Sequence, residues 1–170
     1  MIATLILIQE LSKPEEVWKR AETKLGSVSQ VRVLFETRDV VTKRLVYRGS
    51  YNFRRGKEIQ FEYEDLVERC RAGADADSCW VSPADFRGYN DTVPQRQPYF
   101  IVSITRKADA LDSPLAIDKP VKRVGFSEQI ETTDGTKILI DSRKNLINQI
   151  EGQDTSHERI VTTFTYKKVI

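Results

Sequence analysis

Three residue types associated with nucleophilic catalysis stand close together near the C-terminus, in the stretch "DTSHE". Asp154, Ser156 and His157 are the residue types of a hydrolytic triad. A triad is a geometry of side chains, however, and neighbouring residues of a hairpin loop point in different directions. His157 is the single histidine of the chain. We therefore expect it to be a solvated loop residue and expect no catalytic residue here.

The two cysteines, Cys70 and Cys79, together with one histidine, are too few for a tetrahedral zinc site. Cys70 as a nucleophile would need a base, and His157 is the one histidine that could serve. The stretch "DADSC" begins like a calcium-binding loop, but Trp80 and Phe86 stand where that loop requires a glycine and an acidic residue. We expect separate, reduced thiols and no metal or cofactor.

The glycines stand singly, so the sequence has neither a phosphate-binding glycine loop nor a nucleophile elbow. We therefore expect a protein that is not an enzyme. The net charge of +2 over 170 residues gives no overall field that would recruit nucleic acid or a membrane. The apolar run 5–8 has no basic residues before it and is too short to span a bilayer, so it predicts a buried strand. We expect synthesis in the cytoplasm without a signal peptide or transmembrane segment, and no membrane partner.

The stretch "YNFRRGKEIQFEY", residues 51–63, combines aromatic and basic residues, as a nucleic-acid surface does. Its aromatic residues all carry odd numbers, whereas Arg54 and the acidic residues carry even numbers. A three-residue loop ending at Gly56 pairs Tyr51 with Ile59 and places the aromatic side chains on one face of a hairpin. That separation favours a core hairpin, with Arg54 and Arg55 in a basic patch near its tip.

Capping residues predict a helix over 12–26, with Ser12 as N-cap, Glu15 as its capping-box partner and Gly26 as the stop. One face of this helix is apolar: Val17, Trp18, Ala21 and Leu25. A second, short helix is predicted over 64–73.

Alternation predicts several antiparallel strands with one buried face. A loop ending at Gly135 places Ile130 opposite Ile138, and a further strand starts at Tyr99. The residues expected to face inward are Val31, Val33, Phe35, Phe126, Ile138, Ile140, Ile160, Phe164 and Tyr166.

The sum is a β-rich α+β fold, an antiparallel sandwich or partly closed barrel of about eight or nine strands. One N-terminal helix packs on it and a short helix lies in mid-chain. We expect a single domain over 1–170, with a long irregular arm or lid at 74–98 and a second irregular connection at 107–120.

The hypothesis that the sequence favours is a non-enzymatic, structural subunit of a larger assembly, such as a virion or tail-type particle. Its partners would be copies of itself or other assembly subunits. The interface candidates are Trp80, Phe86, Tyr89, Arg54 and Arg55. One alternative is a small-molecule-binding β-barrel closed by the 74–98 segment. A second alternative, less favoured, is a domain that binds single-stranded nucleic acid.

Overall fold

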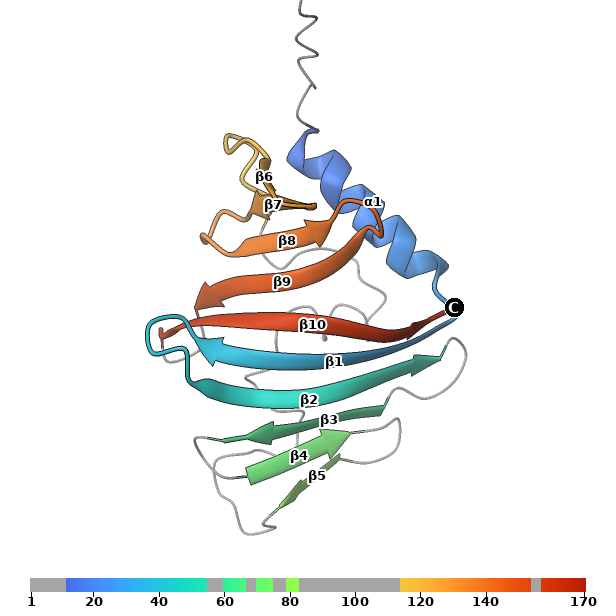
Figure 1. Cartoon of the computed structure of the whole chain (residues 1–170), viewed down its shortest axis with the longest axis vertical. Coiled ribbons are helices and arrows are strands. Elements are labelled where there is room, and N and C mark those ends of the chain that lie inside the picture. Colours follow the sequence, from blue (N-terminus) through green and yellow to red (C-terminus); the bar gives the residue numbers. More distant parts are fainter. Residues whose placement is uncertain (1–11, 55–59, 67–69, 75–78, 83–113, 154–156) are drawn as a thin grey trace, which may run out of the picture.

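A single antiparallel sheet carries the fold, with one helix packed against it (Figure 1). The computed structural model describes residues 12–54, 60–66, 70–74, 79–82, 114–153 and 157–170. The helix is α1 (Pro14–Ser27). The strands are β1 (Gln30–Asp39), β2 (Leu45–Arg54), β3 (Gln60–Asp65), β4 (Cys70–Ala74), β5 (Cys79–Ser82), β6 (Lys122–Val124), β7 (Ser127–Glu131), β8 (Lys137–Asp141), β9 (Leu146–Gln153) and β10 (Arg159–Val169).

The strand order is β5-β4-β3-β2-β1-β10-β9-β8-β7-β6, so β1 and β10, from opposite ends of the described chain, pair at the centre. The predicted class is confirmed: the protein is β-rich, antiparallel and has its helix near the N-terminus. The ten described strands form one continuous sheet. This arrangement agrees with the predicted partly closed barrel better than with the predicted sandwich, which would have two stacked sheets. Within the described ranges, no helix is long and apolar enough to cross a membrane.

One face of this sheet, here called the inner face, is buried across seven strands. A single row of cross-strand partners runs along it, and no member is more than 7% exposed. The row, from β3 to β7, is Asp65, Tyr47, Thr37, Thr162, Ile150, Ile138 and Ile130. Because cross-strand partners point to the same side, these seven residues define the inner face. The row is polar toward β3 and aliphatic toward β7.

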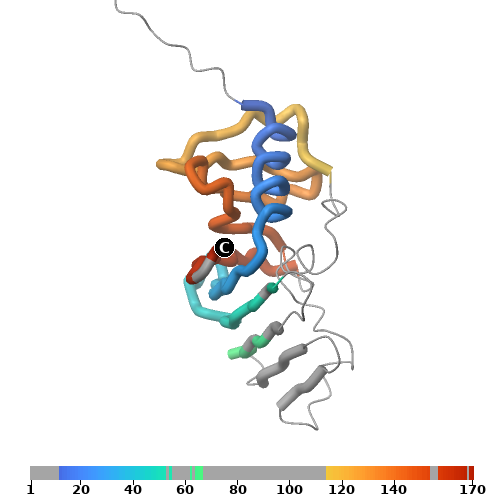
Figure 2. The backbone as a smooth tube through the Cα atoms, turned by 90° about the vertical axis from the view of Figure 1, so that its right-hand side faces the viewer, coloured from blue at the N-terminus to red at the C-terminus, as the bar shows by residue number. Residues whose placement is uncertain are grey.

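Helix α1 covers the aliphatic half of the inner face, where it packs against β7 and β9. Its Val17 and Ala21 are fully buried in the core, and Trp18 packs against them as predicted. Figure 2 shows the helix lying along one side of the sheet. The predicted capping residues are shifted by one position: the N-cap is Lys13, not Ser12. The Glu16 carboxylate, not that of Glu15, accepts the N–H of the N-cap residue at 3.4 Å.

The hairpin of β2 and β3 confirms the predicted separation of faces. Tyr47 and Tyr51 are 2% and 1% exposed, whereas Arg48 is exposed. The predicted register is wrong, because Tyr51 pairs with Phe61 instead of Ile59. The observed register differs from the predicted one by two residues. Because side chains alternate between the faces with a period of two, a shift of two residues leaves the predicted inward residues unchanged.

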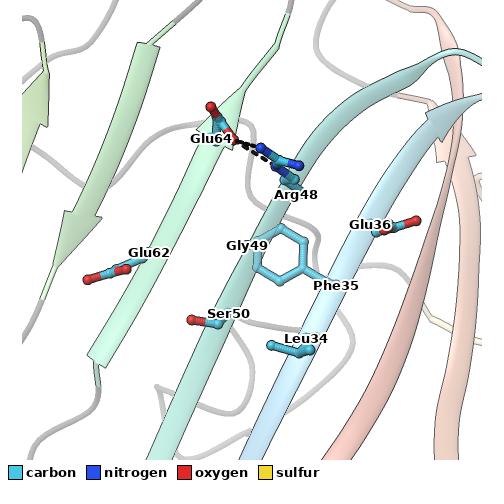
Figure 3. A pocket seen from close by; sticks show the side chains of 8 residues that line it. All are labelled: Leu34, Phe35, Glu36, Arg48, Gly49, Ser50, Glu62 and Glu64. Atoms are coloured by element: carbon cyan, nitrogen blue, oxygen red, sulfur yellow. Dashed lines mark hydrogen bonds and ion pairs between the residues drawn. The ribbon is translucent and has the colours of Figure 1, made fainter.

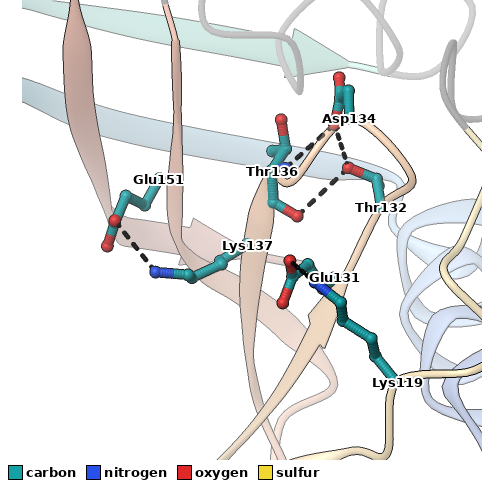
Figure 4. Close-up of polar contacts among 7 residues, drawn as sticks. All are labelled: Lys119, Glu131, Thr132, Asp134, Thr136, Lys137 and Glu151. Carbon is teal, nitrogen blue, oxygen red and sulfur yellow. Dashed lines mark hydrogen bonds and ion pairs between the residues drawn. The ribbon is translucent and has the colours of Figure 1, made fainter.

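The β7–β8 turn forms as predicted, with Ile130 opposite Ile138 and Gly135 at a φ of +85°. The Asp134 carboxylate accepts hydrogen bonds from the Thr132 hydroxyl and, at 3.0 Å, from the Thr136 N–H (Figure 4). This network closes the loop around the left-handed residue, where glycine has no steric cost.

The prediction of a short helix over 64–73 is wrong. Residues 70–74 form strand β4, which pairs with β3 from Asp65↔Cys70 onward. A helix of this length is marginal by itself, whereas the free edge of β3 offers a ladder of backbone hydrogen bonds. The first part of the 74–98 range is also not irregular, since Cys79–Ser82 forms β5 on the edge of β4. The strand predicted at 5–8, the one predicted from Tyr99 and most of the two irregular connections lie outside the described residues.

Candidate functional site

The central strands place three rows of side chains on the inner face beyond the edge of α1. The first is the polar row of Thr162, Thr37, Tyr47 and Asp65. The second brings Phe164, Phe35 and Gly49 together, and the third brings Tyr166, Val33 and Tyr51 together. Each row has its central member on β1, so the alternation of Val33, Phe35 and Thr37 along this strand positions the site. We call these three rows the tyrosine site.

The polar row at one end of the site is buried. Thr37 and Asp65 are 0% exposed, and Thr162 is 3% exposed. The hydroxyl groups of Thr37 and Thr162 lie 2.8 Å apart and hydrogen-bond across β1 and β10. A hydrogen bond of this kind satisfies polar atoms that would otherwise be costly to bury.

Tyr51 differs from the polar row because its hydroxyl has no partner. Among the described residues, its Oη atom is the one buried side-chain polar atom without a hydrogen bond. Burial raises the pKa of the Tyr51 phenol, so the group stays protonated and able to donate. A buried hydroxyl without a partner costs stability, and such atoms in folded proteins call for an explanation.

Tyr166, in the same row, provides a direct contrast. Its hydroxyl donates to the main-chain oxygen of Ile147 at 2.9 Å. Both phenols have a pKa raised by burial, and both rings lie next to Val33 in the strand register. The two tyrosines therefore form a matched pair, one with a hydrogen-bond partner and one without.

Replacing each tyrosine by phenylalanine is expected to change stability in opposite directions. Tyr51→Phe removes an unsatisfied buried hydroxyl and is expected to raise the free energy of unfolding by about 1 kcal/mol. Tyr166→Phe removes a formed hydrogen bond and is expected to lower it by about 1 kcal/mol. Urea unfolding of both variants measures the difference, and a Tyr51→Phe variant less stable than the wild type would contradict the assignment.

The opposite, outer face carries an open depression of about 360 Å³ across β1, β2 and β3 (Figure 3). Its lining consists of the outward residues Leu34, Glu36, Arg48, Ser50, Glu62 and Glu64, together with Phe35 and Gly49 from the second row of the tyrosine site, between which β1 and β2 pair. The one guanidinium in it, that of Arg48, is bound to the Glu64 carboxylate at 2.7 Å. The Glu36 carboxylate is paired in turn with Arg38 at 3.0 Å. The lining of this depression therefore offers no uncompensated cation to a phosphate group.

The structure does not bring the predicted interface residues together among those it describes. Arg54 ends β2 with an exposed side chain, opposite Gln30. Trp80 lies on β5, and strands β3 and β4 stand between β5 and β2. Arg55, Phe86 and Tyr89 lie outside the described residues.

The remaining reactive residues are dispersed. His157 is exposed, as predicted, with a left-handed φ of 63°. Cys79 pairs with Ala74, four residues along β4 from Cys70, so the two Cα atoms are at least about 13 Å apart. A disulfide requires a separation below about 7 Å, so the register excludes one within this chain. In the described part of the chain, no three histidine, cysteine or acidic side chains are grouped as metal ligands would be.

No family profile and no curated protein sequence matches the chain. Among solved structures, it is similar to a chain of the MucA/MucB complex of Pseudomonas aeruginosa, with 9% identity and a TM-score of 0.47. That match covers 92% of this chain and 58% of the other. It is also similar to the LolA superfamily protein NE2245 of Nitrosomonas europaea, with 10% identity, a TM-score of 0.42 and 93% of both chains covered. Both TM-scores are below 0.5, so neither similarity carries an argument about what this chain binds.

The fold and site together define a class: a β-rich α+β domain with one broad antiparallel sheet, whose inner face is half aliphatic under a helix and half aromatic and polar. The sequence predicts Tyr51 in the core but does not show that its hydroxyl lacks a partner. The parity of the hairpin shows that the ring is inward, yet whether its hydroxyl finds a partner depends on atoms of other strands, which the sequence does not place.

Proposed function

We propose that the protein binds a small amphipathic molecule at the tyrosine site, with an apolar body and one hydrogen-bonding group. The observation that carries the proposal is the buried, unpartnered hydroxyl of Tyr51. Ligand pockets are mostly apolar, with a few placed polar groups that fix orientation. The Phe35 and Phe164 rings would contact the apolar body, and the Tyr51 hydroxyl would bond the polar group.

The proposal corresponds to the small-molecule-binding alternative drawn from the sequence. The favoured sequence hypothesis, a particle subunit, depended on aromatic residues of which Phe86 and Tyr89 lie outside the described part of the chain. No contact among the described residues supports it. The small-molecule alternative is supported by the Tyr51 hydroxyl, an atom for which a ligand would supply the missing partner.

Displacement of a fluorescent apolar probe, N-phenyl-1-naphthylamine, tests the proposal. Three competitors of similar size separate the polar contact from the apolar one: decanol, methyl decanoate and undecane. In Tyr51→Phe, affinity for decanol and methyl decanoate is expected to fall about three- to tenfold, since one hydrogen bond is lost. Affinity for undecane is expected to stay unchanged.

The matched control is Tyr166→Phe, whose hydroxyl already has a partner and is not expected to contribute to binding. No probe binding by the wild-type chain would overturn the proposed function. An equal loss for all three competitors would retain an apolar site and overturn the role of the Tyr51 hydroxyl.

A further inference from the structure

The turn between β6 and β7 exposes an aromatic side chain that alternation predicts to be buried. Phe126 is 69% exposed, and its neighbour Val124 is 48% exposed. Phe126 lies just before β7 begins, so the inward orientation expected from the sequence is wrong. Among the residues whose side chains the structure describes, no other aromatic side chain is as exposed. Exposed apolar side chains that cluster mark interaction sites more often than isolated ones do.

The exposed ring is held by the fold. Gly125, between the two apolar residues, has a left-handed φ of 60° and turns the chain. The main-chain oxygen of Phe126 accepts two hydrogen bonds from Ser142 in the neighbouring β8–β9 turn, from N–H at 3.0 Å and from the hydroxyl at 2.6 Å. The two turns thus form one surface, and the ring needs little ordering when it docks.

Basic residues occur in both turns. The β6–β7 segment contributes Lys122 and Arg123, and the β8–β9 turn contributes Arg143 and Lys144. The Arg143 guanidinium lies 4.2 Å from the centre of the Phe126 ring. We call the two turns with these residues the basic tip.

The charge of the basic tip is concentrated. Asp141 is the one carboxylate within segments 121–127 and 141–146, and its Oδ1 accepts the N–H groups of Arg143 and Lys144, each at 2.8 Å. Arg123 stands opposite Glu128 of β7. With both carboxylates counted against the four basic residues, the basic tip carries a formal charge of +2, which equals that of the whole chain. The rest of the chain is therefore close to neutral.

We propose that the basic tip docks on the surface of an anionic lipid bilayer. The Phe126 ring and Val124 would enter the boundary between headgroups and acyl chains, and the side chains of Lys122, Arg143 and Lys144 would meet the anionic headgroups. An exposed ring among cations has the composition of such a surface, which needs apolar burial and charge together. The inference does not depend on the proposed function and departs from the sequence-based expectation of no membrane partner.

Co-sedimentation of the full chain with vesicles tests the inference. Vesicles of phosphatidylglycerol and phosphatidylcholine in equal parts are expected to bind the protein, and vesicles of phosphatidylcholine alone are expected to bind it weakly. Phe126→Ser is expected to lower the partition coefficient about tenfold, from the apolar burial that it removes. Val41→Ser is the matched control, because Val41 is 82% exposed on the β1–β2 turn, away from the basic tip.

The double variant Arg143→Gln/Lys144→Gln tests the charge contribution. It is expected to lower binding to the anionic vesicles roughly thirtyfold and to weaken the dependence on salt. Equal binding to both vesicle types, or no binding to either, would overturn the inference. Binding that survives Phe126→Ser but not the double variant would overturn the insertion of the ring and leave a purely electrostatic contact with the headgroups.

Discussion

Replacing Gly49 by alanine is expected to lower the free energy of unfolding by about 3 kcal/mol. A Cβ atom at this position would lie 2.2 Å from the main-chain oxygen of Glu62 and 2.5 Å from the ring of Phe35. Neither neighbour can give way easily, because Glu62 belongs to β3, which pairs with β2, and the Phe35 ring is 2% exposed in the core. The glycine is thus required by the close approach of its neighbours.

The matched control is Gly26→Ala in the last turn of α1. No atom lies within 4 Å of a Cβ built on Gly26, so alanine meets no obstacle there. Higher helix propensity is expected to raise stability by about 0.5 kcal/mol or more. Urea unfolding of both variants gives the two free energies, and a Gly49→Ala protein as stable as the wild type would show that β2 and β3 can separate at this point without cost.

The position of Gly49 also shows what the sequence predicts and what it leaves open. Alternation in β1 predicts that Phe35 faces inward, and that prediction is confirmed; its cross-strand partner is Gly49. The sequence does not show that the two are direct partners, since this requires the register between the strands. Because glycine has no side chain, the Phe35 ring can lie over β2 at this position. The reason for a glycine here can therefore be recognised only when the pairing of β1 with β2 is known.

The two errors of larger consequence have a common physical origin. The 64–73 segment has apolar residues at helical spacing, and Phe126 has the parity of an inward strand residue. In both cases a tertiary contact decides the outcome: β4 completes the edge of β3, and Ser142 holds the main chain of Phe126 outside the strand. Local sequence patterns predict which residues share an apolar face. They do not predict which neighbouring segment forms hydrogen bonds with the backbone.

The same limit applies to the tyrosine site. The sequence predicts its rings, through the odd numbering of the hairpin, and it predicts that the inner face is buried. It does not distinguish Tyr51 from Tyr166, because a hydrogen bond to Ile147 on β9 is set by how three strands lie together. A candidate ligand contact could therefore be recognised from the structure and not from residue spacing.

An ion pair fixes α1 on the sheet, and breaking it is expected to have the second large effect. The Arg20 guanidinium lies 2.6 Å from the Glu128 carboxylate, whose side chain is 9% exposed. Glu128 stands opposite Ile140 on β8, and its side chain is buried on the inner face. Arg20→Met would leave this carboxylate without its ion-pair partner and is expected to cost about 2 kcal/mol; Arg20 is 40% exposed, which moderates the loss.

A second replacement, Glu128→Leu, is expected to restore most of that stability in the double variant, because an apolar pair of similar volume removes the desolvation cost. The control is Arg48→Met, which breaks an ion pair with side chains 57% and 32% exposed and is expected to cost at most about 0.5 kcal/mol. A double-mutant cycle by urea unfolding measures the coupling between Arg20 and Glu128. If Arg20→Met costs no more than Arg48→Met, the ion pair contributes little, and the apolar contacts of Val17 and Ala21 alone hold α1 on the sheet.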